Sequence, residues 1–410
     1  MEVVFITDSY YPNPSPNAIC VGKLRREFER RGIKTTIIAV RTFSKSVSIP
    51  NDADVNFIEP DVYYSIWYEI NNQKDFKKIR FMQYVFRLRG ALYGLLWPLM
   101  SLSHLHRYKK NLKKILNECI DDDIIVIGVY KSLEAALAGA QVKKKYKQAK
   151  FVLYTLDAIA GSIIPSIYGS KKIAKRSIKL WERILFNSYD FLYLMKSHEE
   201  TYTNDYYKEF QYKIRFTDIP LLDIERKCDG ITSTQSKRLI FTGSMSKETA
   251  DPRYLLELID RISQDDIIIE FYGLITDSDI LTAINESTFA TYNGSLPHEE
   301  IVNKQEQAFA LLNFGNFTPC GIPCKIFEYF STGKPVISCF KIDDDASKPY
   351  MEKYPNALLI DERRPIDENA EKLISFLNSK FTYDRNEINR LYKDNTPAAT
   401  VDMIISDALK

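Results

Sequence analysis

The segment from residue 319 to residue 338 combines a tight turn, a short helix and a cation. A Gly/Pro turn precedes a predicted helix over 324–331, and a Gly-Lys-Pro turn then leads into a buried strand. Helix N-terminal amides and Lys325, in the first turn, would suit a diphosphate. Glu328, one turn later, could accept hydrogen bonds from a ribose diol. The two side chains could also form an ordinary i,i+3 surface pair, but the whole segment favours diphosphate binding.

A second candidate loop follows the first predicted strand, over 3–7, and leads into a predicted helix over 18–31. Loops at the carboxyl ends of parallel strands face the ligand crevice of an open α/β sheet. Small residues at Ser15, Asn17 and Ala18 would let a ligand approach the amides at the start of the helix. A proline-stiffened connection that binds nothing fits the same residues.

Short apolar runs alternate with helical stretches, which is the pattern of βα units around a parallel sheet. A polar linker over 221–236 separates two such sets. We predict an N-terminal domain over 1–220, with a basic amphipathic insertion at about 76–117, and a C-terminal domain over 237–395. A helix over 396–410 is expected to pack back on the N-terminal domain. The fold class is therefore α/β, with two Rossmann-like domains whose parallel sheets face a central cleft.

The predicted elements are short and evenly spaced. The strands are expected at 3–7, 35–40, 124–129, 151–156, 191–195, 238–242, 267–272, 308–313 and 335–339. The helices are expected at 18–31, 133–146, 171–188, 252–262, 297–307 and 324–331.

Composition excludes several classes of protein. The chain of 410 residues is 45% hydrophobic and 27% charged, which is not the composition of a disordered or collagen-like chain. The first residues form a strand-like run without a basic leader or a cleavage site, so we expect a cytoplasmic protein. The six cysteines are scattered and are expected to be reduced. Cys320, Cys324 and Cys339 lack a CxxC pair and a neighbouring histidine, so we expect no metal site.

The net charge of +2 hides an asymmetry between the two halves of the chain. Residues 1–200 carry 32 basic and 20 acidic side chains, whereas residues 201–410 carry 24 and 34. The predicted N-terminal domain is therefore the one that would attract an anionic partner.

Several stretches together resemble the GT-B glycosyltransferases, especially the large retaining family that builds bacterial capsules, O-antigens and exopolysaccharides. The strongest is 323–338, which is similar to that family's nucleotide-sugar signature. The others are the first strand with 10–14, the Arg-Gly helix end with the following strand at 31–38, the strand and glycine loop at 241–244, and the Gly-Ser-Leu-Pro stretch at 293–300.

The resemblance implies that the C-terminal domain binds a UDP- or GDP-linked sugar. Glu328 matches the glutamate that holds the ribose hydroxyls in the family. The other implied contacts are Gly243 and Ser244 at the phosphates, Leu296 at the nucleobase, and Gly321 and Ile322 near the donor sugar and diphosphate.

The chain departs from the family pattern at two charged positions. Cys320 stands where the family has the first of its paired glutamates, so the usual sugar-contacting carboxylate is missing. Ser244 stands where an arginine normally follows the phosphate-loop glycine. The charge of the diphosphate would have to be offset by one or more of Lys247, Arg253 and Lys325.

In the predicted acceptor domain, Asp157 ends a strand on the side of the cleft. Many family members place a histidine or an aspartate there, close to the reacting sugar, which makes Asp157 the candidate catalytic residue. A helix-capping aspartate is the alternative. All four histidines lie elsewhere in the sequence, which argues against a histidine base, and Glu182 is interpreted as structural.

The insertion suggests a membrane surface. Residues 76–117 contain ten basic and no acidic side chains, mixed with many apolar and aromatic ones. Such a mixture suits an interfacial helix on anionic lipid. A core-packed insertion with a basic edge is the alternative, and no nucleic-acid-binding motif is present. The expected membrane contacts are Arg87, Arg89, Trp97, Arg107 and Lys109.

The resemblance thus implies a hexosyltransferase that is retaining, independent of metal and without a cofactor besides its nucleotide-sugar co-substrate. Its acceptor would be a saccharide or a polyprenyl-diphosphate-linked saccharide, and the protein would lie at the inner face of the plasma membrane. Two alternatives remain open: a catalytically weak binding or scaffold subunit with the same fold, and a sugar-nucleotide epimerase.

Overall fold

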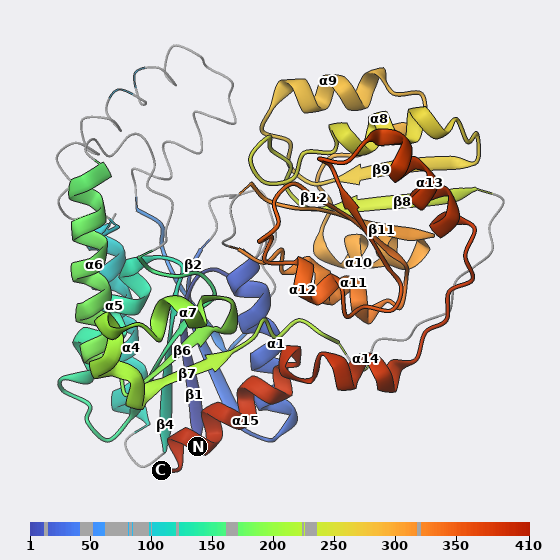
Figure 1. The fold of residues 1–410 in the computed structure, drawn as a ribbon. Coiled ribbons are helices and arrows are strands. Elements are labelled where there is room, and N and C mark those ends of the chain that lie inside the picture. The colour runs from blue at the N-terminus through green and yellow to red at the C-terminus, as the bar shows by residue number, and fades with distance from the viewer. Residues whose placement is uncertain are drawn as a thin grey trace. The chain divides into compact units, whose positions relative to one another are not determined.

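The fold is taken from a computed structural model. It describes residues 1–11, 15–41, 52–61, 81, 84, 98–99, 101–119, 123–160, 171–223, 225, 236–317 and 321–410. The chain forms two compact units (Figure 1). Unit 1 consists of Met1–Pro220 and Pro397–Lys410, and unit 2 consists of Leu221–Thr396.

Unit 1 contains a seven-stranded sheet in the order β3-β2-β1-β4-β5-β6-β7, and all of its pairings are parallel. The central strands are almost wholly buried, in agreement with their continuous apolar runs. The strands are β1 (Glu2–Ser9), β2 (Lys34–Val40), β3 (Val55–Ile58), β4 (Ile124–Tyr130), β5 (Lys150–Thr155), β6 (Phe191–Met195) and β7 (Ile214–Thr217).

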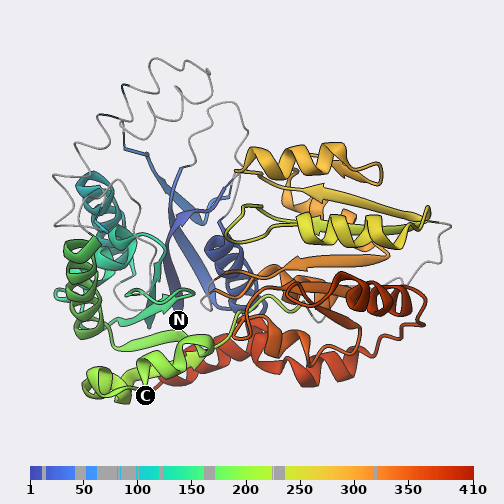
Figure 2. The ribbon, with the colours of Figure 1, turned by 45° about the horizontal axis from the view of Figure 1, so that its top comes forward.

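Helices α4, α5 and α6 lie side by side in unit 1 (Figures 1 and 2). The middle one, α5, is almost entirely buried, and its small residues allow close packing on β4. The Tyr189 hydroxyl fits between them and donates to the Ala136 carbonyl over 2.6 Å. Within the described residues, unit 1 has the helices α1 (Pro16–Arg30), α4 (Leu102–Glu118), α5 (Leu133–Lys143), α6 (Lys171–Ser188), α7 (Glu199–Tyr202) and α15 (Pro397–Ala408), with 3-10 helices η2 (Lys196–His198) and η3 (Asp205–Lys213).

The C-terminal helix α15 belongs to unit 1, where it packs against α1. Its buried Asp407 accepts hydrogen bonds from the Tyr193 hydroxyl at 2.9 Å and from Arg215 Nε at 2.7 Å. Burial alone would raise the pKa of Asp407, but the hydrogen bonds from Arg215, Lys410 and Tyr193 together lower it below its usual value. The ionised carboxylate therefore ties α15 to β6 and β7.

We predict that Asp407→Ala destabilises unit 1 by about 2–4 kcal/mol, because it leaves the Tyr193 hydroxyl without its acceptor and the Arg215 guanidinium without its carboxylate partner. Urea unfolding followed by circular dichroism measures the loss. Asp402→Ala, which removes an exposed carboxylate from the same helix, is the control. It should lower the free energy of unfolding by less than about 1 kcal/mol. Equal losses in the two variants would contradict this role of Asp407.

Unit 2 contains a six-stranded parallel sheet in the order β10-β9-β8-β11-β12-β13. Its strands are β8 (Lys237–Thr242), β9 (Ile267–Tyr272), β10 (Ala290–Tyr292), β11 (Ala310–Phe314), β12 (Val336–Phe340) and β13 (Ala357–Asp361). Its helices are α8 (Arg253–Ile262), α9 (Ser278–Glu286), α10 (His298–Gln307), α11 (Lys325–Ser331), α12 (Lys348–Met351), α13 (Ile366–Leu377) and α14 (Arg385–Leu391), with η4 (Lys393–Asn395). Helix α8 contacts α9 and α13, and the three share one apolar core with the sheet.

The predicted alternation of strands and helices is confirmed in both units. Four edge strands were not predicted from the sequence: β3, β7, β10 and β13. Several helices, such as α9, α13 and α14, were not predicted either. The edge strands are short and half-exposed, so they lack the continuous apolar run that marks a buried strand. Most of the insertion before α4, and residues 226–235 of the predicted linker, lie outside the described residues. No helix in the described part of the chain is long and apolar enough to cross a membrane.

Candidate functional site

Three glycines follow three adjacent strands at the carboxyl edge of the unit 2 sheet. Gly243, Gly273 and Gly294 follow β8, β9 and β10 and have φ values of 135°, 129° and 72°. The Gly243 amide donates to the Tyr272 carbonyl over 2.8 Å, and the Gly273 amide donates to the Gly294 carbonyl over 2.8 Å. A Cβ atom on Gly273 would lie 2.0 Å from the Gly243 carbonyl oxygen. These loops are therefore in backbone contact, and Gly243 is exposed at their surface.

The Lys325 amine lies beside this glycine loop. A Cβ atom on Gly243 would be 3.5 Å from Lys325 Nζ, and Nζ is 3.4 Å from the centroid of the Phe241 ring. Among the described residues, no hydrogen bond or ion pair involves this amine. Burial lowers its pKa well below the usual value. The ring face attracts the cation, but a bound anion would stabilise it far more.

Glu328 lies one turn further along α11, with a side chain that is 13% exposed. His298, the first residue of α10, places Nε2 3.6 Å from Glu328 Oε1. Glu328 is predicted from the sequence as a site residue, whereas His298 is not, because nothing in the spacing of residues 298 and 328 indicates a contact. Leu296, the expected neighbour of the nucleobase, lies two residues before His298 and is half-buried.

A buried set of hydrogen bonds fixes α10 and α11 against β8. The hydroxyls of Thr242 and Tyr329 lie 2.9 Å apart, and Gln305 Nε2 donates to Thr242 Oγ1 over 3.3 Å. The Thr242 amide also donates to the Tyr329 hydroxyl over 3.2 Å. Since Tyr329 and Gln305 lie on the same helices as Lys325 and His298, these bonds set the positions of the candidate binding residues.

In unit 1, Ser15 is the N-cap residue of α1. The Ala18 amide donates to Ser15 Oγ over 3.2 Å, and Ser15 Oγ donates to Asp8 Oδ1 over 2.9 Å. Asn17 and Ala18 are buried, and burial raises the pKa of Asp8. Ser15, Asn17 and Ala18 are the ligand neighbours predicted from the sequence, and in the structure Asp8, near the end of the first strand, is bonded to Ser15.

Asp157 is exposed two residues after β5, and the loop that carries it is held by buried polar groups. Glu182 of α6 accepts from the Ala160 amide over 3.1 Å and from the Tyr202 hydroxyl over 3.1 Å. The same hydroxyl accepts from the Ile159 amide over 3.1 Å. Burial raises the pKa of Glu182, and Tyr207, Ala160 and Tyr202 oppose that rise. Glu182 therefore fastens the loop of Asp157 to α6 and α7.

The structure brings one histidine near Asp157, although the sequence separates them by about forty residues. His198 is buried just beyond β6, the strand next to β5. Burial lowers the pKa of His198, and the charge of Asp157 opposes this shift. Parallel strand ends meet at one edge of the sheet, so His198 beyond β6 and Asp157 beyond β5 lie at the same edge. That no histidine acts as the catalytic base stays a prediction.

Comparisons with known proteins agree on the fold. No family model matches the chain, and no curated protein matches it. Among solved structures, HepE of Anabaena in complex with UDP is 10% identical with a TM-score of 0.59, covering 100% of this chain and 99% of that one. A glycosyltransferase from Rickettsia africae ESF-5 is 12% identical with a TM-score of 0.59, covering 100% and 98%. The lipopolysaccharide outer core galactosyltransferase WaaB in its apo form is 13% identical with a TM-score of 0.53, covering 100% and 99%.

The chain has a GT-B fold. At these identities the likeness establishes the fold alone, and the two parallel sheets agree with it. Within the GT-B fold, unit 2 corresponds to the half predicted to bind the donor and unit 1 to the half predicted to bind the acceptor.

Two of the three cations expected at the diphosphate already have carboxylate partners. Lys247 Nζ forms an exposed ion pair with Asp279, and Arg253 binds Asp251 with an Nη2–Oδ2 distance of 2.6 Å. Of the three, Lys325 is the one without a carboxylate partner among the described residues. Ser244 is exposed next to Gly243, and Cys320 lies outside the described residues.

The loop after β11 supplies the last two predicted residues. Gly321 has a φ of 99°, and its carbonyl accepts from Asn316 Nδ2 over 2.9 Å, while Ile322 is buried. Among the described residues, no group of three or more histidine, cysteine, aspartate or glutamate side chains could hold a metal ion.

A buried ion pair, which the sequence did not reveal, lies beyond β12 and β13 at the same edge of the sheet. Lys341 Nζ is 3.8 Å from Glu362 Oε1, with side chains 7% and 13% exposed, and neither atom has a hydrogen-bond partner among the described residues. Burial raises the pKa of Glu362 to about 7, and the charge of Lys341 only partly offsets it. The ionised form of Glu362 is therefore a cost to unit 2.

We predict a pH dependence of stability that originates at Glu362. A carboxyl group whose pKa is raised in the folded state stabilises the protein fully below its unfolded pKa of about 4.5. That contribution is lost as the pH rises through about 7, and amounts to about 3 kcal/mol at most. Urea unfolding of the wild type and of Glu362→Gln between pH 5 and pH 8 measures it. Relative to the variant, the wild type should lose stability as the pH rises. Parallel curves would contradict the assignment.

Proposed function

We propose that the protein is a glycosyltransferase that moves a sugar from a nucleotide-sugar donor to a saccharide acceptor. The observation that carries the proposal is the placement of the Lys325 amine beside the exposed glycine loop at Gly243, with Glu328 one turn further along the same helix. One nucleoside diphosphate could contact both residues, with its phosphates beside Lys325 and its ribose hydroxyls on Glu328. The structure of HepE with UDP, which shares this fold, supports a nucleotide, and we propose a UDP- or GDP-linked sugar.

Lys325 would act on the leaving group. As the bond to the anomeric carbon breaks, negative charge accumulates on the departing diphosphate, and a fixed cation lowers the barrier to this step. A lysine that already lies in a partly buried position at Phe241 needs little reorganisation for this task. We keep the expectation of a reaction that is independent of metal and retains the anomeric configuration.

Asp157 is the proposed catalytic residue of the acceptor half. Its side chain is exposed on a loop that Glu182 and Tyr202 hold in place, so it can meet a substrate at little entropic cost. The charge of Asp157 acts on the buried imidazole of His198, where it opposes the lowering of the pKa by burial.

A catalytically weak binding or scaffold subunit remains the competing proposal. The pairing of Lys247 and Arg253 with aspartates, and the cysteine at position 320, favour it. A transferase would slowly hydrolyse a bound donor when no acceptor is present, and a scaffold would not. An epimerase would instead convert the donor into a second nucleotide-sugar.

We predict that Lys325→Met weakens UDP binding about tenfold to a hundredfold and leaves the affinity for uridine unchanged, since the amine would contact only the phosphates. Isothermal titration calorimetry measures both affinities. Because burial disfavours the charged amine, the variant should be no less stable to urea than the wild type.

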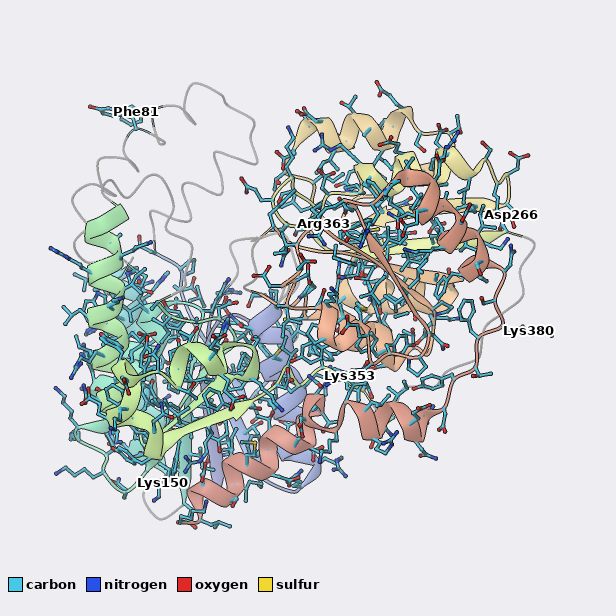
Figure 3. The ribbon with its side chains drawn as sticks, viewed as in Figure 1. Phe81, Lys150, Asp266, Lys353, Arg363 and Lys380 are labelled. Carbon is cyan, nitrogen blue, oxygen red and sulfur yellow. The ribbon has the colours of Figure 1, made fainter. Side chains whose placement is uncertain are left out.

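Lys353→Met is the matched control for this prediction, because Lys353 is exposed just before β13, at the amino edge of the sheet (Figure 3). It should bind UDP as the wild type does. Absence of heat with UDP, GDP and their common sugar derivatives would refute the enzyme proposal.

The acceptor is proposed to be lipid-linked, with the protein on the cytoplasmic face of the plasma membrane. Helix α4 buries one face, which includes Tyr108 and Leu112, and exposes Lys110, Lys113 and Lys114 on another. Unit 1 also exposes large apolar side chains: Phe81 (Figure 3), Tyr84, Leu102, Leu180, Tyr206 and Tyr212. Both the core-packed and the interfacial interpretation of the insertion thus have support from α4.

The named membrane contacts have different environments. Arg107 donates to the Pro60 carbonyl over 3.0 Å and also to the Glu59 carbonyl, so its guanidinium is partly engaged, and Lys109 is half-buried. Arg87, Arg89 and Trp97 lie outside the described residues.

We predict that the protein floats with vesicles of phosphatidylcholine and phosphatidylglycerol and not with phosphatidylcholine alone. Changing Lys110, Lys113 and Lys114 to glutamine should reduce the partition coefficient about a hundredfold, at about 1 kcal/mol for each lysine. The control variant carries glutamine at three exposed lysines of unit 2, Lys353, Lys380 and Lys393. An equal reduction of the partition coefficient in the two triple variants would refute the proposal that unit 1 binds the membrane.

A further inference from the structure

We propose that His298 is a positioning residue, which holds the Glu328 carboxylate in the orientation that receives a ribose diol. The inference rests on the proposed function, since it requires a nucleotide at Glu328. It adds to that function a residue that the family resemblance does not assign. His298 acts on the ligand through Glu328.

The contact between the two side chains is direct. His298 Nε2 is 3.6 Å from Glu328 Oε1, slightly longer than a hydrogen bond and within the range of an ion pair. Glu328 is 13% exposed and His298 is 38% exposed, so the imidazole is the more accessible partner. A small rotation of either side chain would make an N–H···O bond to one carboxylate oxygen.

The backbone of the pair is held independently of the contact. Gln305 lies two turns after His298 on α10, is fully buried, and donates to Thr242 Oγ1 over 3.3 Å. Tyr329 follows Glu328 on α11, and its hydroxyl lies 2.9 Å from the same Thr242 oxygen. The two helices thus share an anchor on the last residue of β8, which places the imidazole against the carboxylate.

This arrangement suits recognition of two vicinal hydroxyls. A carboxylate can accept from both hydroxyls only when its plane is turned toward them, and an N–H donor on one oxygen restricts that rotation. The Lys325 amine is directed toward Phe241 and Gly243. Lys325 would therefore contact the phosphates, whereas Glu328 would contact the ribose.

The test compares His298→Ala and His298→Gln with the wild type, using UDP and 2′,3′-dideoxy-UDP in calorimetry, with GDP and its dideoxy form in parallel. Glutamine keeps an N–H donor, whereas alanine does not. Asn303→Ala, on the exposed part of α10, is the control for the helix, and thermal unfolding checks each variant. Glu328→Ala and the double variant with His298→Ala complete a thermodynamic cycle.

We expect His298→Ala to weaken UDP binding about tenfold and His298→Gln to weaken it less than about threefold. The dideoxy ligand should bind the wild type and His298→Ala equally, and His298→Ala should add nothing to the loss in Glu328→Ala. An equal loss for both ligands, an additive loss in the double variant, or no loss at all would overturn the proposal. Failure of the wild type to bind UDP and GDP would instead refute the proposed function, and this inference with it.

Discussion

The proposed site depends on the charge of the Lys325 amine, which has no carboxylate partner among the described residues. The amine lies over the Phe241 ring and beside Gly243. Removal from water disfavours its charge, as the lowered pKa shows. An aromatic face compensates for only a small part of that cost. A phosphate at the glycine loop would supply the counter-charge, and the same charge would then assist departure of the diphosphate.

The glycine loops beside Lys325 pack closely against each other. Gly273 touches the carbonyl of Gly243 so closely that any side chain there would collide with it, and both residues have the positive φ that glycine tolerates. The buried hydrogen bonds among Thr242, Tyr329 and Gln305 then fix the two helices that carry Lys325, Glu328 and His298. Rigid placement lets a small number of polar groups select a nucleotide.

The sequence predicted the interior of the fold and several members of the site. The strand expected at 238–242 is Lys237–Thr242 in the structure, and the helix expected at 324–331 is Lys325–Ser331, because apolar runs and turn residues mark buried elements clearly. Gly243 and Lys325, eighty-two residues apart, were both named and are brought together. Edge strands such as β10 were missed because their residues are only partly buried.

Contacts between individual side chains could not be predicted from one sequence. The spacing of residues cannot show that His298 meets Glu328, that His198 lies near Asp157, or that Arg253 binds the aspartate two residues before it. Each contact depends on the angle between two elements or on a rotamer choice, and both are set by packing. The membrane contacts and the donor residues therefore stay proposals, while the GT-B fold is established.

A crystal structure of the full chain with UDP tests the central claim most directly. We expect the diphosphate at the Gly243 loop, with an oxygen within hydrogen-bond distance of Lys325 Nζ and the ribose hydroxyls on the Glu328 carboxylate. A bound UDP whose phosphates lie away from Lys325, or a crystal at saturating UDP whose glycine loop carries no nucleotide, would contradict it.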